Sequence, residues 1–128
     1  MADYGYRKRV KLEFEEAVAR ITAELGQEGF GILTEIDVRE TLKKKLGVDF
    51  PKYMILGACN PPYAKRSLEL EREIGLLLPC NVIVYEGEGE THVATVKPTE
   101  MLGIVGNEKL DEIAQEVETK LKRALDRV

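Results

Sequence analysis

Two short segments of the sequence place a cysteine directly before an asparagine: Leu-Gly-Ala-Cys-Asn at residues 56–60 and Leu-Leu-Pro-Cys-Asn at residues 77–81. A cysteine thiolate acts as a nucleophile, a redox group or a metal ligand, so Cys59 and Cys80 are the residues from which chemistry is first expected. Cys59 closes one predicted strand and Cys80 opens the next. The two segments therefore form the candidate site at the level of sequence.

Cys59 has two interpretations, and the sequence leaves both open. It lies just before Asn60 and Pro61, a pair typical of a helix start, where unpaired N–H groups and the helix dipole favour a thiolate. This position makes Cys59 the candidate catalytic residue. The structural alternative is a small buried hydrophobe packed beside Ala58, because free cysteines are commonly buried.

Cys80 follows Pro79 inside the most apolar stretch of the chain, residues 74–85, which favours a packing role. The two asparagines are expected to bond their own backbones, Asn60 as a helix cap and Asn81 in a turn that enters a strand. If the two strands are antiparallel neighbours, the thiols approach each other. If the strands are parallel, the thiols lie about 20 Å apart.

Other catalytic and metal centres find little support. The single histidine, His92, lies on a predicted hairpin strand and is a weak candidate for the base of a Cys–His dyad. Two separated cysteines and one histidine do not make a zinc knuckle. A phosphate-binding glycine loop is also missing, because residues 103–106 lack its spacing and its preceding strand. The sequence predicts no metal and no cofactor, and it favours a binding protein over an enzyme.

A basic cluster lies on a second predicted helix. Lys43, Lys44 and Lys45 follow one another there, and the start of the helix after Asn60 attracts anions. A small anionic ligand is therefore a predicted partner. The alternative is a solvated helix face with cations near its C-terminus. The candidate ligand-binding residues are Lys43, Lys45, Cys59, Asn60, Cys80 and Asn81.

Composition excludes several classes of function. The net charge of -4, from 19 basic and 23 acidic residues, gives no general attraction for nucleic acid. The N-terminus lacks the layout of a signal peptide, and no apolar run approaches the ~20 residues of a membrane span. Two cysteines in such a chain fit a reducing compartment, so a cytoplasmic location is expected. The length of 128 residues with 44% hydrophobic content predicts a single domain, residues 1–128.

The periodicity of apolar residues predicts the elements that position these motifs. A period of two indicates strands, a spacing of three and four indicates helices, and glycine, proline and asparagine mark the ends. The predicted helices have apolar stripes that include Val38, Leu42 and Leu46 in the second and Leu110, Ala114, Val117, Leu121, Ala124 and Val128 in the last. Strands are predicted at residues 4–10, 30–36, 52–59, 81–85 and 91–97, and helices at residues 13–25, 38–46, 61–72 and 108–128.

The order is strand-helix-strand-helix-strand-helix-strand-strand-helix. Residues 86–90 contain two glycines between two strand-like runs and predict a hairpin, which rules out a uniformly parallel sheet. The strand at residues 52–59 is apolar on both faces and is expected to be covered on each side. Residues after Pro98 are expected to be irregular. The fold class is therefore α+β, with a mixed, largely antiparallel sheet covered by helices.

The segments at residues 36–47, 56–61 and 75–85 resemble family 302 of the domains of unknown function, which are small prokaryotic proteins of about this length. The resemblance runs from about residue 30 to residue 101. It implies an α+β fold, a homodimer and no established activity, and it brings no cofactor or catalytic residue. The family's signature positions here would be Lys43, Lys45, Gly57, Cys59, Asn60, Pro61, Leu78, Pro79, Cys80 and Asn81.

The leading functional hypothesis is a small dimeric module for ligand binding or sensing, with a pocket at Cys59, Asn60 and Pro61. A thiol-dependent enzyme or redox protein that uses Cys59 is the first alternative. A structural or interaction protein, with the apolar seam of the last helix as its interface, is the second.

Overall fold

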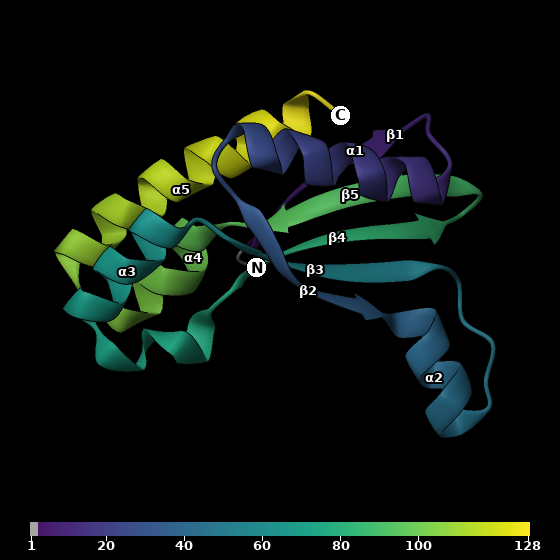
Figure 1. Cartoon of the computed structure of the whole chain (residues 1–128), viewed down its shortest axis with the longest axis horizontal. Helices are drawn as coiled ribbons and strands as arrows, with labels where there is room; N and C mark the ends of the chain where they lie inside the picture. Colours follow the sequence, from purple (N-terminus) through teal and green to yellow (C-terminus); the bar gives the residue numbers. More distant parts are fainter. Residues whose placement is uncertain (1–2) are drawn as a thin grey trace.

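The structure is a computed structural model that describes residues 3–128. All nine predicted elements are present in the predicted order, so the α+β class is confirmed (Figure 1). Two stretches differ from the prediction. Residues 98–105, predicted to be irregular, are helical, and the helix after Asn60 is shorter than predicted and is followed by a 3₁₀ helix. The elements are β1 (Gly5–Val10), α1 (Phe14–Gln27), β2 (Gly31–Asp37), α2 (Val38–Leu46), β3 (Tyr53–Cys59), α3 (Pro61–Leu70), η1 (Arg72–Leu77), β4 (Cys80–Gly87), β5 (Glu90–Val96), α4 (Pro98–Leu102), η2 (Gly103–Val105) and α5 (Glu108–Asp126).

The strands form one five-stranded sheet in the order β1-β5-β4-β3-β2. Each neighbouring pair is antiparallel. The predicted hairpin joins β4 to β5, with a turn at Glu88 and Gly89, and both of these residues have positive φ. Because β3 and β4 are antiparallel neighbours, the end of β3 lies beside the start of β4.

Helices α1 and α5 pack together on one face of the sheet (Figure 1). Their apolar residues meet the inward side chains of β3, β4 and β5, and burial of this kind of surface is the main force that stabilises a fold. The predicted seam of α5 is part of this core, and Leu121 is completely buried. The seam therefore packs on its own chain, and the hypothesis that it forms the interface with a partner is wrong. The start of α5 is as predicted, because the Asn107 side chain accepts from the N–H groups of Lys109 and Leu110.

The opposite face of the sheet carries none of these helices. We call this face the open face. Along each strand its side chains alternate with the buried ones, and the strand register aligns them across the sheet. The prediction that β3 is covered on each side is therefore wrong for this chain. The open face consists of Tyr53, Ile55 and Gly57 on β3, Asn81, Ile83 and Tyr85 on β4, and His92, Ala94 and Val96 on β5.

Helix α2 extends beyond the end of β2, away from the core (Figure 1). Asp37 caps it and accepts from the N–H of Glu40 at 2.9 Å, and Gly47 ends it in the left-handed region. The predicted buried stripe is wrong, because α2 contains no buried residue and Leu46 is 68% exposed. Helix α2 therefore has the apolar pattern of an amphipathic helix, but its apolar side is not buried. Across residues 3–128, no helix has the length and apolar character needed to cross a membrane.

Candidate functional site

An apolar pocket of about 300 Å³ opens where β3 ends and β4 begins. Helix α3 forms one wall, the residues around η1 form another, and Ile113 and Val117 of α5 close the inner side. Pockets that combine an apolar lining with a few polar groups are the usual binding sites for small molecules. The remaining lining residues are Phe30, Leu33, Ala58, Cys59, Asn60, Tyr63, Ala64, Ser67, Leu68, Gly75, Leu78, Pro79, Cys80 and Leu102.

Both cysteines line this pocket, and both are free thiols. The register pairs Ala58 with Cys80, so Cys59 is one residue beyond the partner of Cys80. Of the two arrangements left open by the sequence, the antiparallel one is therefore correct. Successive side chains of a strand leave it on opposite sides, so the register does not set the two thiols directly opposite each other.

The Cys80 thiol is buried beneath the pocket. Burial, and secondarily the nearby Cys59, raise the pKa of Cys80 to about 11. At neutral pH this thiol is protonated, and a protonated thiol is a poor nucleophile and metal ligand. The packing role favoured by the sequence agrees with this environment.

Cys59 is partly exposed at the pocket mouth, immediately before α3. Pro61 and Pro62 occupy the first two positions of that helix and have no N–H to donate. The N–H of Ala64 is bonded to the carbonyl of Asn60 at 3.0 Å, which leaves Tyr63 as the one N–H donor of the first turn. The predicted stabilisation of a thiolate by unpaired N–H groups therefore depends on a single group.

Asn60 holds the rim of the pocket, but not as a helix cap. Its Nδ2 donates to the carbonyl of Glu28 at 3.0 Å, and α3 has no side-chain cap, so the predicted backbone bond is wrong. Gly29 lies directly beneath Asn60 with a φ of +88°, and a Cβ there would lie 3.2 Å from Nδ2. Asn60 thus fixes the start of α3 to the end of α1.

Asn81 does not line the pocket. It is exposed on the open face opposite Gly57, and within residues 3–128 its side chain makes no hydrogen bond to the backbone, so the predicted turn is also wrong. Gly57 lies under Thr34 and Pro79, and a Cβ on Gly57 would lie 2.8 Å from Pro79 Cγ and even closer to Thr34. A glycine is needed here because its neighbours occupy the space of a side chain.

The structure does not bring the lysines to the cysteines. Lys43 and Lys45 lie on α2, at the end of β3 opposite to Cys59 (Figure 1). The seven residues of β3 separate them, or about 20 Å at ~3.3 Å per residue. Lys43 forms an ion pair with Asp49 at 3.1 Å instead. The predicted combination of a thiol and a basic cluster in one pocket is not formed.

The comparison with known proteins agrees with the resemblance noted in the sequence. The family model described as "Domain of unknown function DUF302" matches residues 6–128. The chain belongs to this family. A solved structure described as an uncharacterized conserved protein DUF302 from Bacillus stearothermophilus is similar to it, with 38% identity, a TM-score of 0.93 and coverage of 98% of each chain. No curated protein matches the chain.

In this DUF302 protein, His92 takes no part in the pocket. The register aligns His92 with Tyr85 and Tyr85 with Tyr53, which places the imidazole at the opposite end of the sheet from Cys59. His92 stacks on Tyr85 with ring centroids 4.8 Å apart, and its Nε2 lies 3.2 Å from the carbonyl oxygen of Gly87. A Cys59–His92 dyad is therefore excluded.

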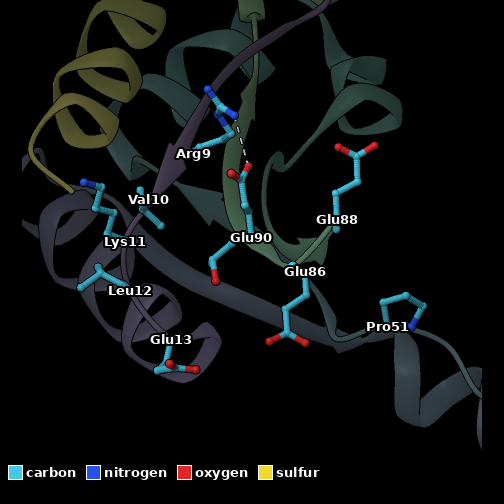
Figure 2. Close-up of a pocket in the computed structure, with 12 residues that line it drawn as sticks. Arg9, Val10, Lys11, Leu12, Glu13, Pro51, Glu86, Glu88 and Glu90 are labelled. Carbon is cyan, nitrogen blue, oxygen red and sulfur yellow. Dashed lines mark hydrogen bonds and ion pairs between the residues drawn. The ribbon is translucent and has the colours of Figure 1, made fainter.

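A second hollow, which the sequence did not predict, lies beside the β4–β5 hairpin. It measures about 880 Å³ and is lined by Glu13, Glu86, Glu88 and Glu90 together with Arg9 and Lys11 (Figure 2). The labelled carboxylates point in different directions, and Glu90 pairs with Arg9 at 3.3 Å. Within residues 3–128 no group of three metal-ligating side chains converges, so this acidic hollow is not a metal centre.

The sequence analysis also did not identify the residues that form the walls of the cysteine pocket. Tyr63, Ala64, Ser67 and Leu68 supply the wall from α3. Their spacing of one, three and four residues on a predicted helix was a usable signal, because such residues share one face. The contribution of Ile113 on α5 had no local signal, since nothing in the sequence relates that helix to residues 59–80.

Proposed function

We propose that this DUF302 protein binds a small, largely apolar ligand in the cysteine pocket. The observation that carries the proposal is the pocket itself, an apolar hollow of about 300 Å³ whose mouth holds Cys59 and whose floor holds Cys80. Hollows of this volume accommodate small molecules, and burial of apolar ligand surface supplies the binding energy. The thiols add polarisable contacts without the desolvation cost of a charge.

The class of ligand differs from the one expected from the sequence. The lysines of α2 lie at the other end of β3, and no lysine or arginine is among the residues that line the cysteine pocket. Burial of an unpaired carboxylate or phosphate in an apolar pocket is costly. The geometry therefore favours a neutral or amphiphilic molecule whose apolar part enters the pocket.

Binding is favoured over catalysis by the state of the side chains around the pocket. Cys80 is held protonated, and His92 is distant. A thiol enzyme needs a base within hydrogen-bond reach of its nucleophile. Among the lining residues, none is a histidine, aspartate, glutamate or lysine.

A thermal-shift experiment with octanol and octanoate tests this function. The two probes have the same alkyl chain and differ in charge, so stabilisation by both supports an apolar pocket. In Ala64→Phe the pocket is filled, and we expect both shifts to disappear while the unliganded protein melts normally. Leu76→Phe, at an exposed position outside the pocket, is the control and should keep both shifts. Stabilisation by neither probe contradicts the proposal.

A thiol-dependent function at Cys59 remains the second candidate, because a partly exposed thiol and a buried one line the same pocket. Iodoacetamide labelling at neutral pH, read by mass spectrometry, tests it. Labelling of Cys59 much faster than of a cysteine in a short peptide supports activation. Labelling at or below the peptide rate contradicts it.

We further propose that the protein acts as a cytoplasmic homodimer, as the family resemblance implies. Free thiols at both cysteines fit a reducing compartment. Exposed apolar residues in and around α2, namely Ile36, Leu46, Val48 and Phe50, support a dimer, because monomeric proteins rarely expose large contiguous apolar surfaces.

A further inference from the structure

We propose that the ligand of the cysteine pocket is a medium-length alkyl chain that ends in an acidic group, and that Arg72, just outside the pocket, binds this group. The inference rests on the function proposed above and adds the chemical class of the ligand. The observation that carries it is a second, shallower hollow that shares an edge with the pocket. This outer hollow is lined by Cys59, Pro61, Ala64, Lys65, Leu68, Glu69 and Arg72.

The pocket and the outer hollow meet along one edge. Cys59, Ala64 and Leu68 line both of them. Ala64 and Leu68 lie four residues apart on α3, about 6 Å along its axis, so their side chains follow one another on one face of the helix. The edge is lowest at Ala64, because its side chain is the smallest of the three. An alkyl chain in the pocket can therefore leave it over Ala64 and reach the outer hollow.

The interior of the pocket suits hydrocarbon alone. None of its lining residues is charged. Its two amide and hydroxyl side chains are already occupied, because Ser67 Oγ donates to the carbonyl of Tyr63 at 2.8 Å and Asn60 Nδ2 donates to the carbonyl of Glu28 at 3.0 Å. A volume of about 300 Å³ holds roughly ten water-sized groups, which suits a free molecule with one medium-length chain.

The outer hollow, in contrast, has a positive charge that is not neutralised. Lys65 and Glu69 pair with each other at 3.2 Å, so their charges largely cancel. Arg72 is exposed, and within residues 3–128 it forms no ion pair and no side-chain hydrogen bond. All other arginines except Arg39 form ion pairs. A guanidinium binds a carboxylate or phosphate through two parallel N–H bonds, so Arg72 is available for an acidic group.

Together the two hollows match the two halves of an acidic amphiphile. A carboxylate inside the pocket would lose water without gaining a partner, which is costly. In the outer hollow the same carboxylate keeps its contact with water and gains Arg72. A cationic group in this place would be repelled by the guanidinium. The anion therefore binds at η1, and the lysines of α2 that the sequence indicated take no part.

NMR titration of the full chain with octanoate, octanol and octylammonium tests the class of ligand, because the three probes share one alkyl chain and differ in charge. We expect octanoate to bind most tightly and octylammonium least, with amide shifts at Cys59, Ala64 and Leu68 for each bound probe. Arg72→Gln should raise the Kd of octanoate about threefold, the size expected for an exposed ion pair, and leave that of octanol unchanged. High salt should have the same effect as Arg72→Gln.

Arg39→Gln is the matched control. Arg39 is also exposed and also without an ion pair within residues 3–128, but it lies on α2, so its substitution should leave all three Kd values unchanged. Binding of none of the probes overturns both the proposed function and this inference. Equal Kd values for octanoate and octanol in wild type overturn the acidic class alone and leave the apolar pocket in place. A preference for octanoate that survives Arg72→Gln overturns the role of Arg72.

Discussion

Single residues in this protein owe their chemical character to their neighbours more than to their motifs. Cys59 and Cys80 occur in similar five-residue segments and line the same pocket, yet one thiol is partly exposed and the other is buried with a raised pKa. Burial disfavours the charged form of an acid, and the neighbouring cysteine adds to this effect. Gly57 illustrates the same dependence, because Thr34 and Pro79 fill the space of its missing side chain.

The Cys80 thiol should make stability depend on pH in the alkaline range. Its pKa is about 11 in the folded protein, above the value of about 8.5 in an unfolded chain. The folded state therefore retains a proton that the unfolded state loses, and stability falls as pH rises from about 8.5 towards 11. The loss is of the order of 2–3 kcal/mol. Urea unfolding in reducing buffer should show this loss in wild type and a smaller one in Cys80→Ala. Equal losses in the two proteins would contradict the assignment.

Gly57→Ala should destabilise the protein by about 1–3 kcal/mol, the usual cost of overpacking. The new methyl group would meet Pro79 Cγ at 2.8 Å and would collide with Thr34. Gly75→Ala is the control, because no atom lies within 4 Å of a Cβ built there, and its effect should be within about 0.5 kcal/mol. Urea denaturation measures both. The idea fails if the two substitutions have the same effect.

At the scale of elements, the pocket depends on contacts that hold helix ends in place. The start of α3 is tied to the end of α1 by the bond from Asn60 to the carbonyl of Glu28. The Glu28 carboxylate in turn pairs with Arg123 at 2.9 Å and Arg127 at 3.0 Å near the end of α5. Glu28 thus links α1, α3 and α5 around one side of the core.

Loss of the Glu28 carboxylate should destabilise the fold only at pH values at which Glu28 is ionised. Burial raises the pKa of Glu28, but hydrogen bonds from Arg123 and Arg127 outweigh burial and lower it overall. Its contribution is therefore present above the unfolded pKa and is lost as pH falls through the folded pKa. Glu28→Gln should cost about 1 kcal/mol at pH 7, in the range of ion pairs, and much less near pH 3. Unfolding at the two pH values measures the difference, with the exposed Glu112→Gln as control. A cost that does not change with pH would show that packing, not charge, is responsible.

At the scale of the whole molecule, the fold is asymmetric. One face of the sheet is covered by α1 and α5, whereas the open face carries partly exposed apolar side chains and α2 contains no buried residue. The cysteine pocket lies at the end of the sheet far from α2, so ligand binding and the proposed dimer contact use different parts of the molecule (Figure 1).

Substitution in the covered core should therefore affect stability without affecting association. Leu121→Ala removes a completely buried side chain and should destabilise the protein by about 2–5 kcal/mol. Where the variant is still folded, sedimentation should show the same association as wild type. A folded variant that has lost association would show that the seam of α5 also contributes to the contact between copies.

Local patterns in the sequence determined the elements, their order and most of their ends. Apolar spacing and capping residues such as Asp37 and Asn107 act within a few residues, so their effects can be predicted without a fold. The neighbouring motifs around Cys59 and Cys80 were likewise found from sequence. The sequence left open whether Cys59 and Cys80 lie close together, because the segment between their two strands does not determine whether the strands are parallel or antiparallel.

Only the tertiary structure decided which faces are covered and which residues meet. The apolar alternation of β3 is the same whether its second face meets a helix, another copy or water, so the expected cover was wrong. The sequence allowed Lys43 and Cys59 to share one site, but β3 lies between them, so they lie at opposite ends of the sheet. Asn60 lies before two prolines and bonds across to Glu28 instead of capping its own helix. Each of these outcomes depends on distances between segments that are remote in the chain, and periodicity carries no information about such distances.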